Sequence, residues 1–98
     1  MYESKLKSKE LDELFQAILS LKNEQECYMF FDDLCTVSEL SAIAQRYKVA
    51  GMLQKKMTCH MIAEKTGAST ATISRVNRCL HYGTGGYKMV LERNRREK

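Results

Sequence analysis

The residues with the most informative chemistry lie in one segment, TCHMIAEKTGASTATISRVNRCL, which runs from Thr58 to Leu80. Short hydroxyl side chains and basic residues recur in it. Such groups can hydrogen bond to base edges or phosphate oxygens without filling a DNA groove. The candidate DNA contacts are Thr58, Lys65, Ser69, Thr70, Thr72, Ser74 and Arg78.

Two short helices joined by a sharp turn would position these side chains. Ala63 is small enough for two helices to cross closely, and Gly67 suits the left-handed conformation that ends a helix. Ser69 can cap the second helix, on which Ile73 and Val76 would point inward. This pattern predicts a helix-turn-helix over residues 58–81, a unit that places its second helix in the major groove. An ordinary helical hairpin with a polar outer face is the alternative.

The distribution of charge supports a nucleic-acid partner. The net charge of the 98 residues is +4. Residues 1–53 carry six Lys/Arg against nine Asp/Glu, a net of −3, whereas residues 54–98 carry ten against three, a net of +7. A basic half that contains the helix-turn-helix is the electrostatic footprint of a nucleic-acid binder. The acidic half is the natural candidate for contact between proteins.

The cysteine and histidine residues offer a second possible chemistry. Cys59 is adjacent to His60, and Cys79 is close to His81, so a mixed metal site is conceivable. Zinc sites usually have closely paired ligands, and the chain has no CxxC spacing. We therefore predict no metal and no cofactor, with reduced thiols at all four cysteines, Cys27, Cys35, Cys59 and Cys79.

Enzymatic and membrane functions find little support in the sequence. Only two histidines are present, and the GTGG segment at residues 83–86 lacks the lysine of a phosphate-binding loop. No apolar run is long enough to span a membrane, and the charged N-terminus lacks the apolar region of a secretory signal. We expect a cytoplasmic protein that is not an enzyme.

The pattern of apolar residues predicts six helices in a single all-α domain over residues 1–98. We expect dimerisation helices within residues 5–56, beginning with helices at 5–22 and 24–34, and a C-terminal helix at 87–96. The second helix is apolar around most of its circumference, which favours a homodimer with a shared core. The predicted buried stripe of the third helix is Leu40, Ile43, Ala44, Tyr47, Ala50 and Leu53.

Two adjoining stretches resemble the Trp repressor superfamily, and in particular its YerC/YecD branch. They are LCTVSELSAIAQRYKVAGMLQKKM and the segment quoted above, and GASTATISR is the most specific part. The resemblance covers about half of the chain, from Leu34 to His81. It implies a six-helix, intertwined dimer with two DNA-reading heads, which would meet half-sites roughly 34–36 Å apart. Trp repressor is itself one of the proteins from which the half-site spacing of helix-turn-helix dimers is known, so this spacing follows from the resemblance alone.

The resemblance also implies a pocket for a small effector. The matching positions are Thr36, Arg46, Arg75 and Cys79. Cys79 replaces a serine that binds the amino group of tryptophan, and a thiol is a poor acceptor for an ammonium group. Val76 replaces a glycine, and its branched side chain would fill space that an indole needs. These departures argue against tryptophan, and another effector or none stays open.

These observations together predict a sequence-specific, DNA-binding transcriptional regulator, most simply a repressor. The alternative is a helix-turn-helix module that docks a protein or shapes DNA without reading a sequence. Arg46 and Arg75 also have simpler interpretations, such as an ion pair with an acidic neighbour or a phosphate contact.

Overall fold

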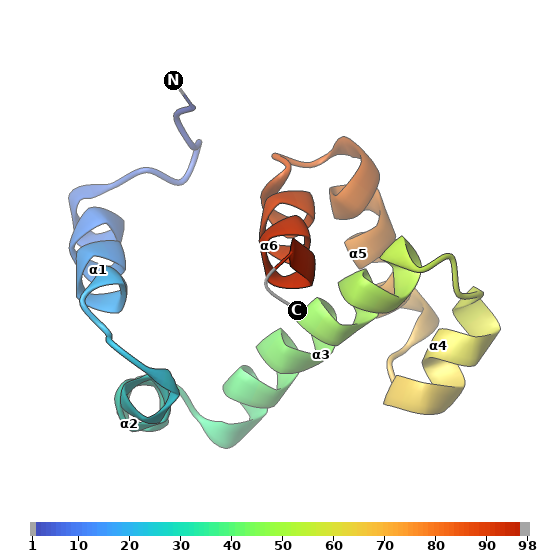
Figure 1. The fold of residues 1–98 in the computed structure, drawn as a ribbon, viewed down its shortest axis with the longest axis horizontal. Coiled ribbons are helices and arrows are strands. Elements are labelled where there is room, and N and C mark those ends of the chain that lie inside the picture. Colours follow the sequence, from blue (N-terminus) through green and yellow to red (C-terminus); the bar gives the residue numbers. More distant parts are fainter. Residues whose placement is uncertain (1, 97–98) are drawn as a thin grey trace. The chain divides into compact units, whose positions relative to one another are not determined.

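The computed structural model describes residues 2–96, with the side chain of residue 96 left out, and over this range the protein is entirely helical. The six helices are α1 (Lys9–Leu19), α2 (Glu24–Leu34), α3 (Val37–Gln54), α4 (Cys59–Thr66), α5 (Thr70–Tyr82) and α6 (Gly86–Arg96). Figure 1 shows their order along the chain. One compact unit ends at Val37 and a second begins at Ser38. The predicted six-helix, all-α class is confirmed.

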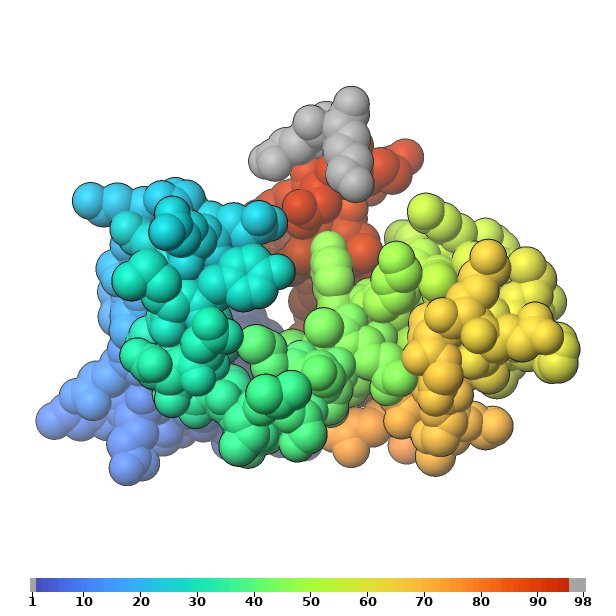
Figure 2. All heavy atoms as spheres, turned by 90° about the horizontal axis from the view of Figure 1, so that it is seen from below, coloured from blue at the N-terminus to red at the C-terminus, as the bar shows by residue number. Residues whose placement is uncertain are grey.

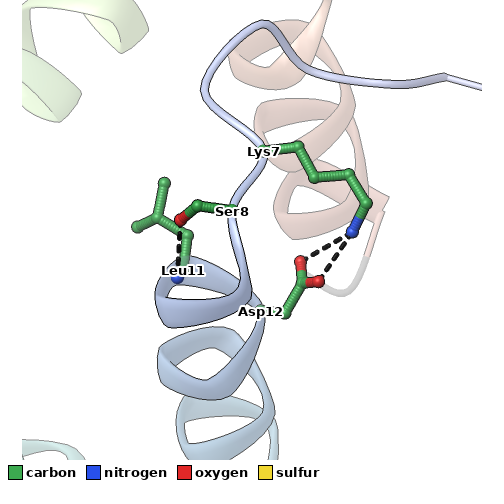
Figure 3. Close-up of polar contacts among 4 residues, drawn as sticks. All are labelled: Lys7, Ser8, Leu11 and Asp12. Carbon is green, nitrogen blue, oxygen red and sulfur yellow. Dashed lines mark hydrogen bonds and ion pairs between the residues drawn. The ribbon is translucent and has the colours of Figure 1, made fainter.

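The first helix is shorter than the predicted range of 5–22. The Ser8 hydroxyl accepts a hydrogen bond from the Leu11 amide at 3.1 Å, which caps α1 and makes Lys9 its first residue (Figure 3). The Lys7 ammonium bonds both carboxylate oxygens of Asp12, at 2.7 and 2.8 Å. The prediction was wrong because the apolar periodicity extends past a serine that caps the helix locally.

The second helix follows the predicted bounds and begins at a capping asparagine. The Asn23 side chain accepts a hydrogen bond from the Glu26 amide at 2.9 Å. Neither α1 nor α2 contains a buried residue, although both are rich in apolar side chains. Leu19 is 76% exposed and Tyr28 is 63% exposed. The apolar surface of this unit is therefore largely uncovered within one chain.

The third helix ends in a Schellman motif that has no clear signal in the sequence. The Met57 amide donates to the carbonyl of Met52, and the Lys56 amide donates to the carbonyl of Leu53. Lys56 itself has a φ of 67°, in the left-handed region that glycine usually occupies. The chain thus turns from α3 toward α4 at a lysine.

The core of the second unit lies where α3, α4 and α5 meet. Its buried residues are Val49, Ala50, Ile62, Ala68, Ile73 and Val76. Tyr87 and Leu91 of α6 pack against this cluster. The prediction for α3 was wrong in part, because Val49 is fully buried while Ile43 and Tyr47 are exposed. Apolar residues occupy more than one face of α3, and only tertiary packing selects the face that becomes core.

The last helix begins one residue earlier than the predicted range of 87–96. Gly86 is its first residue, and the glycine with a left-handed φ of 91° is Gly85, in the preceding loop. Of the glycines in residues 83–86, Gly85 thus forms the turn and Gly86 starts the helix. This turn lets α6 return toward α3, where Leu91 lies beside Gly51.

Candidate nucleic-acid interface

The first helix of the predicted helix-turn-helix, α4, is held by an N-terminal cap and by one buried side chain. The Thr58 hydroxyl accepts a hydrogen bond from the Met61 amide at 3.2 Å and so caps α4. Ile62, one turn into the helix, is fully buried and attaches α4 to the core. Because the hydroxyl of Thr58 is already an acceptor in this cap, its first role is to start the helix.

The turn between the two helices has the predicted glycine and a second stabilising residue. Gly67 has a φ of 74°, and its amide donates to the carbonyl of Ala63 at 2.8 Å. The Thr66 hydroxyl donates to the carbonyl of Ile62 at 2.7 Å and accepts from the Ala68 amide at 3.1 Å. One side chain therefore satisfies backbone groups on both sides of the turn.

A side chain of α3 attaches this turn to the rest of the unit. The Gln45 amide nitrogen donates to the carbonyl of Thr66 at 3.2 Å, and the bond is partly buried. The carbonyl of Thr66 belongs to the last turn of α4, where no intrahelical donor is available. Gln45 thus satisfies a backbone acceptor and links α3 to the turn between α4 and α5.

Helix α5, the second helix of the helix-turn-helix, begins at a capping serine, as the sequence predicted. The Ser69 side chain accepts from the Thr72 amide at 3.1 Å, and its hydroxyl lies 3.0 Å from the Thr72 hydroxyl in a further hydrogen bond. Thr72 is only partly exposed. These two hydroxyls are engaged with each other, so a substitution at either position would also disturb the cap.

The burial pattern of α5 defines an outward face. Ile73, Val76 and Leu80 are buried and fall on one side of the helix. On the helical period of about 3.6 residues, Ser74 and Arg78 fall on the opposite side and are exposed. Thr70, Ala71, Arg75 and Tyr82 are also exposed on this helix. Figure 2 shows α4, the turn and α5 as one continuous surface coloured from yellow to orange.

Two features of this surface were missed by the sequence interpretation. Tyr82 is 87% exposed one turn beyond Arg78, and its apolar type gave no signal of a surface position. Lys65, which was predicted as a DNA contact, lines a hollow together with residues of α3 and α6, and no residue of α5 lines that hollow. Thr70, Ser74 and Arg78 are exposed together on α5, and the DNA contact predicted for the exposed Lys65 stays a prediction.

The four residues predicted for an effector pocket are distributed over both compact units. Thr36 belongs to the unit that ends at Val37, and the other three belong to the unit that begins at Ser38. Arg75 and Cys79 are exposed and one turn apart on α5, and Arg46 is exposed on α3. Val76 is 1% exposed and contributes to the core cluster, so its branched side chain has a packing role.

The remaining candidate features are the cysteines, a metal site and a membrane span. Each of the four cysteines is a free thiol, and three of them are exposed. Within the described residues, no group of three or more Cys, His, Asp or Glu side chains is placed to hold a metal ion. Over the same range, none of the helices combines the length and the apolar character needed to cross a membrane.

Comparison with known proteins agrees with this architecture. Residues 9–95 match the family profile described as Trp repressor protein. The uncharacterized protein YerC of Bacillus subtilis (strain 168) is 59% identical over 93 residues, which cover 95% of this chain and 89% of YerC.

Two solved structures share the fold. One is the crystal structure of a Staphylococcus aureus protein described as a candidate Trp repressor. It superposes with a TM-score of 0.89 and is 53% identical, and the match covers 93% of this chain and 91% of the other. The second is a TrpR-like protein of Eubacterium eligens, with a TM-score of 0.88, 58% identity, and coverage of 91% of this chain and 92% of the other.

Proposed function

Since this chain belongs to the Trp repressor family, we propose that it is a sequence-specific DNA-binding regulator that represses transcription. The observation that carries the proposal is the outward face of α5. Burial of Ile73, Val76 and Leu80 orients this helix so that Ser74 and Arg78 are exposed to solvent. A helix held in this way can enter the major groove, where arginine recognises guanine and short hydroxyls reach either base or phosphate.

Charge supports the same interpretation. The half of the chain that contains α4, α5 and α6 has a net charge of +7, so it would be attracted to the phosphate backbone. Thr70, at the start of α5, would contact phosphate, and Ser74 and Arg78 would contact bases. Thr58, Ser69 and Thr72 would act mainly through the caps that hold the helices in place.

We further propose that the protein acts as a homodimer, with residues 1–98 of each copy contributing to one shared domain. The support is the uncovered apolar surface of α1 and α2, neither of which contains a buried residue. Apolar surface of this extent is typical of a protein interface. Two copies would present two α5 helices to half-sites on the same side of a duplex.

The test is selection of binding sites from a pool of genomic fragments, followed by affinity measurements on the selected site. Arg78→Ala should weaken binding by about tenfold to a hundredfold, because a good base contact is worth roughly 1–3 kcal/mol. The control is Lys22→Ala, which removes the same charge from the exposed loop between α1 and α2. Lys22→Ala should bind as the parent protein does.

The outcomes separate the two functional classes. Enrichment of one near-palindromic site, with loss in Arg78→Ala alone, would support a specific regulator. Recovery of fragments without sequence preference, combined with a steep loss of affinity in added salt, would indicate an architectural role. Equal affinities of Arg78→Ala and the parent for the selected site would show that α5 does not read it.

A further inference from the structure

The second compact unit contains a hollow of about 650 Å³ beside the helix-turn-helix. It is lined by residues of α3, by Met57, by Lys65 of α4 and by the C-terminal part of α6. Its volume falls within the range of roughly 300–1,000 Å³ typical of sites for small molecules. None of the residues of the predicted effector pocket lines it, so it is a distinct site.

The apolar part of the lining comes from several elements. Tyr47 and Met52 of α3, Met57, and Leu91 of α6 all contribute. Gly51 also lines the hollow, and a Cβ atom built on it would lie 3.7 Å from the Leu91 Cδ2 atom. Because Gly51 has no side chain, the hollow reaches the backbone of α3. Aromatic, thioether and aliphatic groups of this kind suit a flat organic body.

The charged part of the lining has a single sign. Lys48 and Lys55 of α3, Lys65 of α4 and Arg95 of α6 all line the hollow, and none of its twelve lining residues is acidic. Arg95 is already paired with Glu92, at 2.8 Å. The three lysines form no ion pair within the described residues. Several unpaired cations on one concave surface raise the local positive potential and favour an anion.

We propose that this hollow, which we call the lysine groove, is a binding site for a small organic anion with an aromatic or other apolar body. The body would lie against Tyr47, Met52 and Leu91, and the anionic group would face Lys48, Lys55 and Lys65. Neither the apolar lining nor the lysines alone would define the ligand. The combination selects an amphipathic anion. This site does not depend on the proposed reading of DNA by α5.

The experiment titrates the full chain with 8-anilinonaphthalene-1-sulfonate, an aromatic anion whose fluorescence rises in an apolar site. N-phenyl-1-naphthylamine, which has the same rings without the sulfonate, is the uncharged comparison. The double variant Lys48→Gln with Lys55→Gln should bind the anionic dye about five- to tenfold more weakly, as expected for the loss of two exposed charge contacts. Its affinity for the uncharged dye should stay unchanged.

The matched control is Lys9→Gln with Lys22→Gln, which removes two exposed lysines outside the groove. It should bind both dyes as the parent does. The amide signals of residues 44–57 and 91–95 should shift in nuclear magnetic resonance spectra when the anionic dye is added.

Three results would overturn the proposal. Equal losses in both double variants would indicate a general effect of charge. Unchanged binding in the groove variant would place the anionic dye elsewhere, for instance on the apolar surface of α1 and α2. Dye binding confined to protein concentrations at which the chain is monomeric would show that a second copy of the chain covers the groove.

Discussion

At the scale of single residues, two positions with left-handed backbone direct the chain into the helix-turn-helix. Gly67, with a φ of 74°, ends α4 and Lys56, with a φ of 67°, ends α3. Glycine adopts this conformation readily, whereas for a residue with a Cβ atom it costs roughly 1–2 kcal/mol. The lysine is tolerated because the Schellman hydrogen bonds of Met57 and Lys56 hold it in place.

The strained backbone at Lys56 leads to a prediction about stability. Lys56→Gly should raise the free energy of unfolding by about 0.5–1 kcal/mol, since relief of the left-handed strain exceeds the added entropy of the unfolded chain. Urea denaturation at a fixed protein concentration measures the change. The control is Lys55→Gly, at the preceding exposed position without a positive φ, which should be neutral or destabilising. A loss of stability in Lys56→Gly would contradict this explanation.

At the scale of elements, the angle between α4 and α5 depends on side chains that bond to the backbone. Thr66 bonds to Ile62 and Ala68 across the turn, and Gln45 reaches the Thr66 carbonyl from α3. The carbonyl of Ile62 also accepts the intrahelical bond from the Thr66 amide, so loss of the hydroxyl would leave only the partly buried Ala68 amide without its partner. The orientation of α5, and hence of Arg78, therefore depends on residues that would never touch DNA.

The corresponding prediction concerns Thr66→Val, which keeps the shape of the side chain and removes the hydroxyl. It should lower the free energy of unfolding by about 1–3 kcal/mol, the cost of leaving the partly buried Ala68 amide unsatisfied. Thermal and urea denaturation would measure this loss. Thr84→Val, in the exposed loop before α6, is the matched control. Its free energy of unfolding should differ from that of the parent by no more than about 0.5 kcal/mol. Equal stability of the two variants would show that the Thr66 hydrogen bonds do not support the turn.

At the scale of the whole molecule, the apolar residues of α1 and α2 are largely uncovered within one chain. Leu19 is 76% exposed and Phe15 is 53% exposed. The core of the second unit is complete without them, because it is built from α3, α4 and α5 with α6 against it. A second copy of the chain is the partner that our proposal supplies.

Dimerisation leads to a prediction about α1. Leu19→Lys should raise the dimer dissociation constant at least tenfold, because burying a leucine is worth about 1.5–3 kcal/mol and a factor of about ten corresponds to about 1.4 kcal/mol. Gln16→Lys adds the same charge at an exposed polar position of α1 and should leave the constant unchanged. Sedimentation equilibrium measures both. A monomeric parent protein would refute the dimer, and equal constants would exclude α1 from its interface.

The features that could be predicted from the sequence are those with local causes. Ser69 caps α5 and Gly67 ends α4 in the left-handed conformation, as predicted. Asn23 and Thr58 cap α2 and α4 and are of types that favour this position, although the sequence interpretation did not name them as caps. Each of these signals involves residues within a few positions of one another. The start of α1 was missed although Ser8 is a good cap, because apolar periodicity alone was followed there. The family could also be inferred, since GASTATISR closely resembles the corresponding string of the Trp repressor superfamily.

The sequence by itself therefore determined the helical class, most helix boundaries and the inward face of α5. Only the tertiary structure decided that α3 buries Val49 and exposes Ile43 and Tyr47. It also decided that Gln45 supports the turn and that Lys48, Lys65 and Arg95 line one groove. Capping and helical periodicity are short-range effects, so a window of residues contains their causes. The groove joins residues up to 51 positions apart, from Ala44 to Arg95, and their proximity depends on how separate helices pack.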